Sequence, residues 1–202
     1  MPDYQVHKIF PCPVFQYQLK NFKKINSELE SYILDLKKKF PEGIKKSNSG
    51  DGWHSPDFML NKGSPPYNFF LSIKEFINIV IENEMGWIYN SDKVRITNMW
   101  SIINKKGSSN IRHMHPNSYL SAAYYVKVPK NSGSISFFDP KEQKNFSYPP
   151  IKKHTEFSSE MIHVKPEEGN LLLFPAYLYH AVGENSSNED RIVISFNIII
   201  DR

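Results

Sequence analysis

The sequence predicts an α+β fold that is mostly β: a double-stranded β-helix (jelly roll) with two or more N-terminal helices backing one sheet. Two amphipathic helical patterns occur before residue 92, and short segments with strand-like alternation follow it. Turn residues such as Lys106-Gly107, Asp139-Pro140 and Glu168-Gly169 separate these segments. Helices with one apolar stripe must cover a sheet, and many short strands favour a two-sheet architecture.

Composition sets the limits for this fold. The 202 residues are 40% hydrophobic and 14% aromatic, which suits one domain with a sizeable core. We expect a single domain over 1–202, with a helical and loop-rich part at 1–92 and the jelly-roll core at 93–202. The net charge of +4 gives no clear signal for nucleic acid. With one cysteine, no secretory pattern and no apolar run of membrane-spanning length, a cytoplasmic protein is expected.

The first part of the chain contains an extended arm and a helix. Residues 6–17 are apolar but carry two prolines, so they can pair only as an edge strand. Ser27 and Glu30 have the spacing of a capping box, and Pro41 ends the helix. The apolar stripe of this helix consists of Ile25, Leu29, Tyr32, Ile33, Leu36 and Phe40.

Residues 41–67 are rich in glycine and proline and predict a long loop. Its Trp53 and Phe58 either fill the core or pack over the mouth of the jelly roll. A second amphipathic helix is expected over 68–85, with Gly86 at its end. Four histidines are expected to have ordinary structural or surface roles: His7, His54, His154 and His163.

Two later segments alternate as strands. In the segment 94–102 one face carries Val94, Ile96, Asn98, Trp100 and Ile102. In the segment 191–200 one face carries Ile192, Ile194, Phe196, Ile198 and Ile200. The opposite face carries Arg191, Val193, Ser195 and Asn197.

A His-x-His pair is the main candidate for chemistry. Side chains of a strand alternate with period two, so His113 and His115 point to the same side and can converge on one ion. His180 lies between two apolar strands and is the best candidate for a third ligand. The sequence therefore predicts a metal site at His113, His115 and His180.

Arg191 adds a second functional signal. It follows His180 by eleven positions and opens the last strand. A guanidinium can hold a carboxylate with two parallel hydrogen bonds, so Arg191 indicates a pocket for an anionic ligand. The alternative is an arginine that only caps a strand in solvent.

These motifs resemble the 2-oxoglutarate- and iron(II)-dependent oxygenases related to the prolyl hydroxylases, over about residues 94–201. The matching segments are His113-Met114-His115-Pro116-Asn117-Ser118-Tyr119-Leu120-Ser121, continuing to Tyr124-Tyr125-Val126, then 133–140, 166–175 with His180, and 191–197. The resemblance implies that His113 and His180 are iron ligands and catalytic residues, and that Arg191 binds the far carboxylate of 2-oxoglutarate. It places Tyr125 beside that carboxylate. Ser121 and Asn197 are further candidates for cofactor binding.

The position of His115 departs from the wider superfamily, which usually has Asp or Glu there to complete a two-histidine, one-carboxylate triad. Either His115 or a carboxylate such as Asp139 would therefore complete the metal site. A neutral imidazole in place of a carboxylate leaves the iron with one more unit of positive charge.

Three functions remain open on this basis. The leading one is an iron(II)- and 2-oxoglutarate-dependent dioxygenase, a hydroxylase of an unidentified small-molecule or peptide substrate. The second is a cupin-type metalloprotein without 2-oxoglutarate, and the third is a vestigial jelly roll used for binding or structure. Arg191 favours the first over the second, and its combination with His113, His180 and Tyr125 argues against the third.

Overall fold

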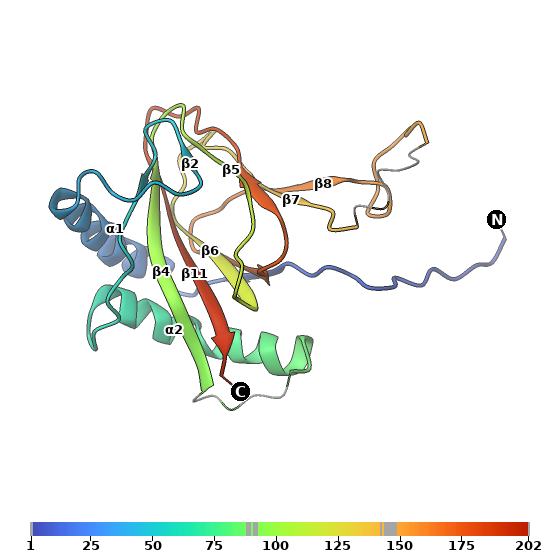
Figure 1. The fold of residues 1–202 in the computed structure, drawn as a ribbon, viewed down its shortest axis with the longest axis horizontal. Helices are drawn as coiled ribbons and strands as arrows, with labels where there is room; N and C mark the ends of the chain where they lie inside the picture. Colours follow the sequence, from blue (N-terminus) through green and yellow to red (C-terminus); the bar gives the residue numbers. More distant parts are fainter. Residues whose placement is uncertain (1, 88–89, 91–92, 142, 144–148, 202) are drawn as a thin grey trace.

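The computed structural model describes residues 2–87, 90, 93–141, 143 and 149–201 (Figure 1). Its helices are α1 (Phe22–Lys39) and α2 (Pro65–Ile79), and α2 continues into a π-helical turn, η1 (Val80–Glu84). The strands are β1 (Phe15–Gln18), β2 (Asn48–Ser49), β3 (Trp53–His54), β4 (Val94–Asn104), β5 (Ser109–His113), β6 (Leu120–Lys127), β7 (Ile135–Phe138), β8 (Met161–Val164), β9 (Asn170–Pro175), β10 (His180–Val182) and β11 (Arg191–Ile200).

The strands form two antiparallel sheets. One has six strands in the order β1-β9-β6-β11-β4-β3, and the other has five in the order β2-β5-β10-β7-β8. Neighbours in the sheets are far apart in the sequence, as in a jelly roll. The predicted fold class is confirmed. Only the end of the N-terminal arm pairs as an edge strand, β1, while residues 6–14 form no strand. The division of the chain at residue 92 stays a prediction.

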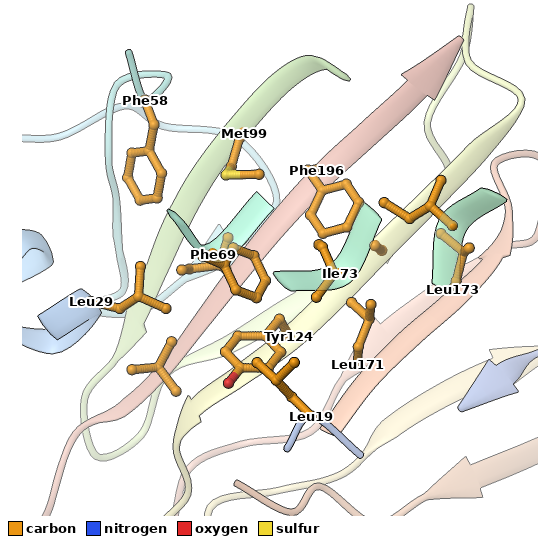
Figure 2. Packing of buried hydrophobic residues seen from close by; sticks show 14 of the residues in the cluster. Leu19, Leu29, Phe58, Phe69, Ile73, Met99, Tyr124, Leu171, Leu173 and Phe196 are labelled. Carbon is orange, nitrogen blue, oxygen red and sulfur yellow. The ribbon is translucent and has the colours of Figure 1, made fainter. Parts of the chain in front are cut away.

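Both helices cover the outer face of the six-stranded sheet (Figure 1). Leu29 of α1 and Phe69 and Ile73 of α2 pack against Tyr124 of β6 and Phe196 of β11 (Figure 2). The side chains of Phe69 and Tyr124 are in contact, with ring centroids 4.4 Å apart. This layer removes a large apolar area from water and is the main hydrophobic contribution to stability.

A second, smaller core lies between the sheets. It joins Tyr125, Phe174 and Val193 of the six-stranded sheet to Ile135 and Phe137 of the other. β11 has residues in both cores, as its alternation predicts: its even-numbered residues 192–198 face the helices, and Val193 faces the second sheet. The predicted faces of β11 are confirmed.

The predicted faces of β4 are wrong for part of the strand. Val94 and Ile96 pack with the helical core, but beyond them Met99 and Ile103 take that side. The register explains the switch, because Asn197 pairs with Asn98 while Ile198 pairs with Ile96, which leaves Thr97 as an extra residue. A one-residue bulge sends all later side chains of β4 to the opposite face.

Three other boundaries differ from the expectations. α1 begins at Phe22, and Ser27 lies inside it and accepts a bond from Ser31 Oγ at its carbonyl, so the expected cap at Ser27 is wrong. The segment 41–67 contains β2 and β3, which pair with β5 and β4. Within that segment Trp53 and Phe58 are buried in the helical core, which settles their role as packing.

α2 starts earlier than expected, at Pro65, because Ser64 caps it by accepting a hydrogen bond from Tyr67 N–H. None of the helices in the described part of the chain is long and apolar enough to cross a membrane.

Asn26 is a buried polar residue that fixes α1 to the sheet. Its Nδ2 donates to the carbonyls of Val126 (2.7 Å) and Tyr125 (3.3 Å), and its Oδ1 accepts from Tyr124 Oη (2.6 Å). Buried polar groups stabilise a fold only when they are paired, so this side chain specifies where α1 sits.

We predict that Asn26→Leu lowers the free energy of unfolding by about 2–4 kcal/mol, because the Tyr124 hydroxyl and the Val126 carbonyl lose their partner in the interior. Tyr124→Phe removes only one bond and should cost about 1 kcal/mol. Chemical denaturation of the three proteins measures both effects. Wild-type stability of Asn26→Leu would contradict the proposed anchor.

Candidate functional site

Three histidines converge at one end of the jelly roll. The ligating nitrogens of His113, His115 and His180 all lie within 4.8 Å of one another. The ring centroids of His113 and His180 are 4.3 Å apart. The ring centroid of His115 lies 5.2 Å from that of His113 and 5.1 Å from that of His180. The predicted convergence of the three rings is therefore present in the structure.

Strand pairing produces this cluster. His113 ends β5, His180 begins β10, and the two residues are directly opposite each other in an antiparallel pair. His115 lies two positions beyond β5, where its backbone N–H donates to the Ala176 carbonyl (3.0 Å). Asn117 then turns the chain with a positive φ of 63°, which asparagine tolerates better than most residues.

Hydrogen bonds fix the tautomer of each ring. Nδ1 of His113 donates to the Ile111 carbonyl (2.7 Å), and Nδ1 of His180 donates to the Leu178 carbonyl (3.0 Å). A carbonyl oxygen only accepts, so the proton lies on Nδ1 and the lone pair lies on Nε2. Nε2 of His115 is buried and has no partner among the described residues. Imidazole nitrogens arranged in this way suit a divalent transition metal, so the three residues fit such an ion.

Burial keeps these rings neutral. It lowers the pKa of His180 to about 3 and that of His115 to about 4. The pKa of His113 is also lowered by burial, and its bond to the Ile111 carbonyl partly opposes this shift. A neutral imidazole is the form that binds a metal, so protons do not compete for these nitrogens at neutral pH.

Ser121 and Asn197 hold the ring of His115. Asn197 Oδ1 accepts from His115 Nδ1 (2.6 Å) and from Ser121 Oγ (2.9 Å). On its other side the ring stacks on Trp100, with centroids 5.7 Å apart. Ser121 and Asn197 were expected as cofactor contacts. In the structure Asn197 bonds to His115 and Ser121 bonds to Asn197, and neither lines the cavity that contains Arg191 and the three histidines.

Asp139 was the alternative source of a ligand. It follows β7, and its carboxylate accepts a hydrogen bond from the Lys141 backbone N–H (3.0 Å). Among the described residues, the group that could hold a metal here consists of the three histidines without Asp139. His115, and not Asp139, is therefore grouped with His113 and His180 in the structure.

Arg191 is only 1% exposed and lies in one cavity with the histidines. The residues that line this cavity include His54, Trp100, His113, His115, Tyr125, Phe174, His180 and Arg191. Nη1 of Arg191 donates to the carbonyls of Ser132 and Gly133, whereas Nε and Nη2 have no partner among the described residues. Burial lowers its pKa to about 10, so the side chain stays charged at neutral pH. The alternative of a solvent-exposed arginine is wrong.

Tyr125 is the neighbour of this guanidinium. Its side chain is buried and lines the cavity, and burial raises the pKa of its hydroxyl, an effect that the charge of Arg191 opposes. The hydroxyl therefore stays protonated and can donate a hydrogen bond. Arg191 and Tyr125 together offer donors without an acidic partner, as a binding site for a carboxylate requires.

Unpaired polar atoms concentrate around this cavity. Nine buried side-chain nitrogen or oxygen atoms of the described residues have no hydrogen-bond partner. Six of them line the cavity: two on His54, one on Trp100, one on His115 and two on Arg191. Unpaired buried polar groups are costly, so their accumulation at one place indicates a ligand site.

His54 is the residue that the sequence did not reveal. It was expected to have an ordinary role, but it is 2% exposed and lines the cavity. It lies in β3, which has two residues and is too short to show an alternating pattern. Only its pairing with Ile102 of β4 fixes its direction, and that pairing is not visible in the sequence.

Solved structures share this fold. The chain is similar to a prolyl-4-hydroxylase from Pseudomonas putida (10% identity, TM-score 0.66, covering 95% of this chain and 94% of the other). It is also similar to a viral collagen prolyl hydroxylase from Paramecium Bursaria Chlorella virus-1 (15% identity, TM-score 0.59, covering 92% of this chain and 94% of the other). Another match is HygX from Streptomyces hygroscopicus, solved with nickel, 2-oxoglutarate and hygromycin B (13% identity, TM-score 0.61, covering 93% of this chain and 82% of the other). At these identities the likeness concerns the fold alone.

Sequence comparison gives the family. No curated protein matches the chain significantly. The family model described as "Putative 2OG-Fe(II) oxygenase" matches residues 98–197, about half of the chain. This segment contains the three clustered histidines, Tyr125 and Arg191. The chain therefore belongs to this family of 2-oxoglutarate- and iron(II)-dependent oxygenases.

Proposed function

We propose that this protein is a hydroxylase that uses iron(II) and 2-oxoglutarate to oxidise a small-molecule or peptide substrate. The observation that carries the proposal is the buried Arg191, whose two unpaired nitrogens line the same cavity as three converging histidines. A buried guanidinium without an acid is unfavourable, and a dicarboxylate co-substrate supplies the missing partner.

His113, His115 and His180 would hold the iron through Nε2, because each Nδ1 is already a donor to the protein. The role of Asn197 and Ser121 is then to keep the His115 ring in the ligating orientation. With dioxygen as the oxidant, iron(II) and 2-oxoglutarate would supply the oxidising chemistry when bound. The protein contributes position, electrostatics and exclusion of water.

Aromatic residues beside the histidines would help to exclude water from the site. The ring of Phe174, which lines the cavity, lies 4.9 Å from that of His180, and the ring of Phe137 lies 6.1 Å from it. Arg191 and Tyr125 would orient the far carboxylate of 2-oxoglutarate and so fix the direction in which the molecule enters. A dry site strengthens both interactions.

The substrate class follows from the relatives only in outline. A prolyl hydroxylase from Trichoplax adhaerens was solved with a peptide fragment, and HygX was solved with hygromycin B. Other similar structures are an epimerase and a carbocyclase from nogalamycin biosynthesis. The fold therefore accepts several reactions, and hydroxylation of a peptide or a small molecule is our proposal for this chain.

The two rival functions fit the site less well. A cupin-type metalloprotein without 2-oxoglutarate uses the histidines but leaves the charge of Arg191 without a partner. A vestigial jelly roll has no reason to retain buried, unpaired nitrogens, since apolar substitutes would stabilise it.

For the metal, we predict that His113→Ala or His180→Ala abolishes stoichiometric iron(II) binding, because each change removes one of the two histidines that face each other across β5 and β10. Anaerobic calorimetric titration measures the binding. His163→Ala, on the exposed strand β8, is the matched control and should bind as the wild type does.

The third ligand is tested in the same way. His115→Ala should bind iron weakly, whereas His115→Asp should still bind it through a carboxylate, and Asp139→Ala should be unaffected. Tight binding by His115→Ala together with loss of binding in Asp139→Ala would refute the three-histidine site.

For the co-substrate, Arg191→Met should weaken 2-oxoglutarate binding by about two to four orders of magnitude, because two charge-assisted hydrogen bonds are lost at about 1.5–3 kcal/mol each. Iron binding should persist. Calorimetry under anaerobic iron(II) gives both affinities, and Arg95→Met, whose side chain pairs with Asp201 at the surface, is the control. Equal affinity of wild type and Arg191→Met would remove Arg191 from the site.

A further inference from the structure

His54 has a buried ring with no protein partner at either nitrogen. It is 2% exposed, and both Nδ1 and Nε2 are unpaired among the described residues. It lies opposite Ile102 of β4, and Ile102 lies opposite Val193 of β11, which pairs with Tyr125 of β6. Residues paired across strands point to the same side, so His54 faces the cavity in one row with Tyr125.

Trp100 offers a second unpaired donor beside it. Its Nε1 is buried and has no partner among the described residues, and its ring lines the same cavity. The ring faces are already in use, since one ring contact is with His115 (5.7 Å) and another is with Lys46 Nζ (4.9 Å). Packing therefore explains the indole ring but leaves its N–H without a role.

The order of residues along β4 shows where the donors of Trp100 and His54 lie between His115 and Arg191. Trp100, Ile102 and Asn104 lie on the cavity face about 7 Å apart. Trp100 contacts His115 at one end, and Asn104 lies opposite Arg191 at the other. His54, beside Ile102, lies between these ends. Burial, more than the nearby charge of Lys46, lowers the pKa of His54 to about 4, so its ring is neutral at neutral pH.

We propose that His54 and Trp100 are binding residues for the keto-acid end of 2-oxoglutarate, and that each donates a hydrogen bond to the carboxylate beside the keto group. This inference rests on the proposed function, in which Arg191 and Tyr125 hold the other carboxylate. It gives the two strands β3 and β4 a direct part in the site.

The chemistry of the two side chains suits this ligand. A neutral histidine offers one N–H donor and a tryptophan offers one, and neither brings a charge that needs a counterion. A carboxylate has about four acceptor positions, so it can satisfy both donors and a metal together. The three-histidine cluster contains no carboxylate to repel this group.

A pair of keto acids separates the two ends of the site. Pyruvate keeps the keto-acid end of 2-oxoglutarate and lacks the far carboxylate. We expect His54→Phe and Trp100→Phe each to weaken both ligands by about ten- to hundredfold, the loss of one hydrogen bond to a charged group. Arg191→Met should weaken 2-oxoglutarate and leave pyruvate unchanged. Anaerobic optical titration of the iron(II) protein with each acid provides the affinities.

Matched variants distinguish binding from folding. His163→Phe, a histidine outside the cavity, should bind both acids normally, and His54→Gln, which keeps a donor, should recover part of the affinity. Metal-free His54→Phe should unfold no more readily than the wild type, because it removes two unpaired buried nitrogens. If either Phe variant fails to fold, the other decides the matter.

Three results would overturn the inference. Normal binding of both acids by both Phe variants would remove these residues from the keto-acid site. Weaker binding of 2-oxoglutarate alone would move their contact to the far carboxylate. Reduced stability of His54→Phe with normal affinities would make His54 structural. Wild-type protein that binds iron(II) but neither acid would instead refute the proposed function itself.

Discussion

The alternation of side chains along β11 is the constraint that connects fold and site. This strand is hydrogen-bonded to both β4 and β6, so its backbone has no freedom to shift register. Its even-numbered residues complete the core beneath the helices, while Arg191, its first residue, and Asn197, six positions later, occupy the opposite face. A slip of one residue would bury the charge of Arg191 among the helices, so the helical core enforces the geometry of the site.

The site is built at a cost to the stability of the fold. The unpaired atoms of His54, Trp100 and Arg191 lie in an interior where each lost hydrogen bond is unfavourable by about 1–3 kcal/mol. The helical core outweighs this cost because it spans both helices and most of the six-stranded sheet. Desolvated polar groups are common where a site must be ready for a ligand.

Periodicity in the sequence is informative where a strand is long and regular. β11 has ten residues without interruption, and its pattern alone predicts both faces and the position of Arg191. The His-x-His pair likewise predicts that His113 and His115 point to the same side. This follows from the two-residue alternation of an extended segment and does not depend on which strand pairs with it. β4 is mispredicted after Thr97 because a bulge changes the phase of the pattern, and a bulge depends on pairing with another strand. His54 is missed for a related reason, since β3 acquires its direction only from β4.

The neutral cluster of histidines changes the electrostatics of the cavity. With a carboxylate at position 115, the negative charge of that ligand would offset part of the charge of a bound divalent ion. Here Asn197, a neutral amide, holds a neutral ring, and Arg191 adds a further positive charge to the same cavity. Coulomb interactions are strong where water is excluded, so a dianion gains more in this cavity than in one with a carboxylate ligand. In the proposed site, this arrangement favours, among ligands of equal size, the one that carries two negative charges, one near each end of the cavity.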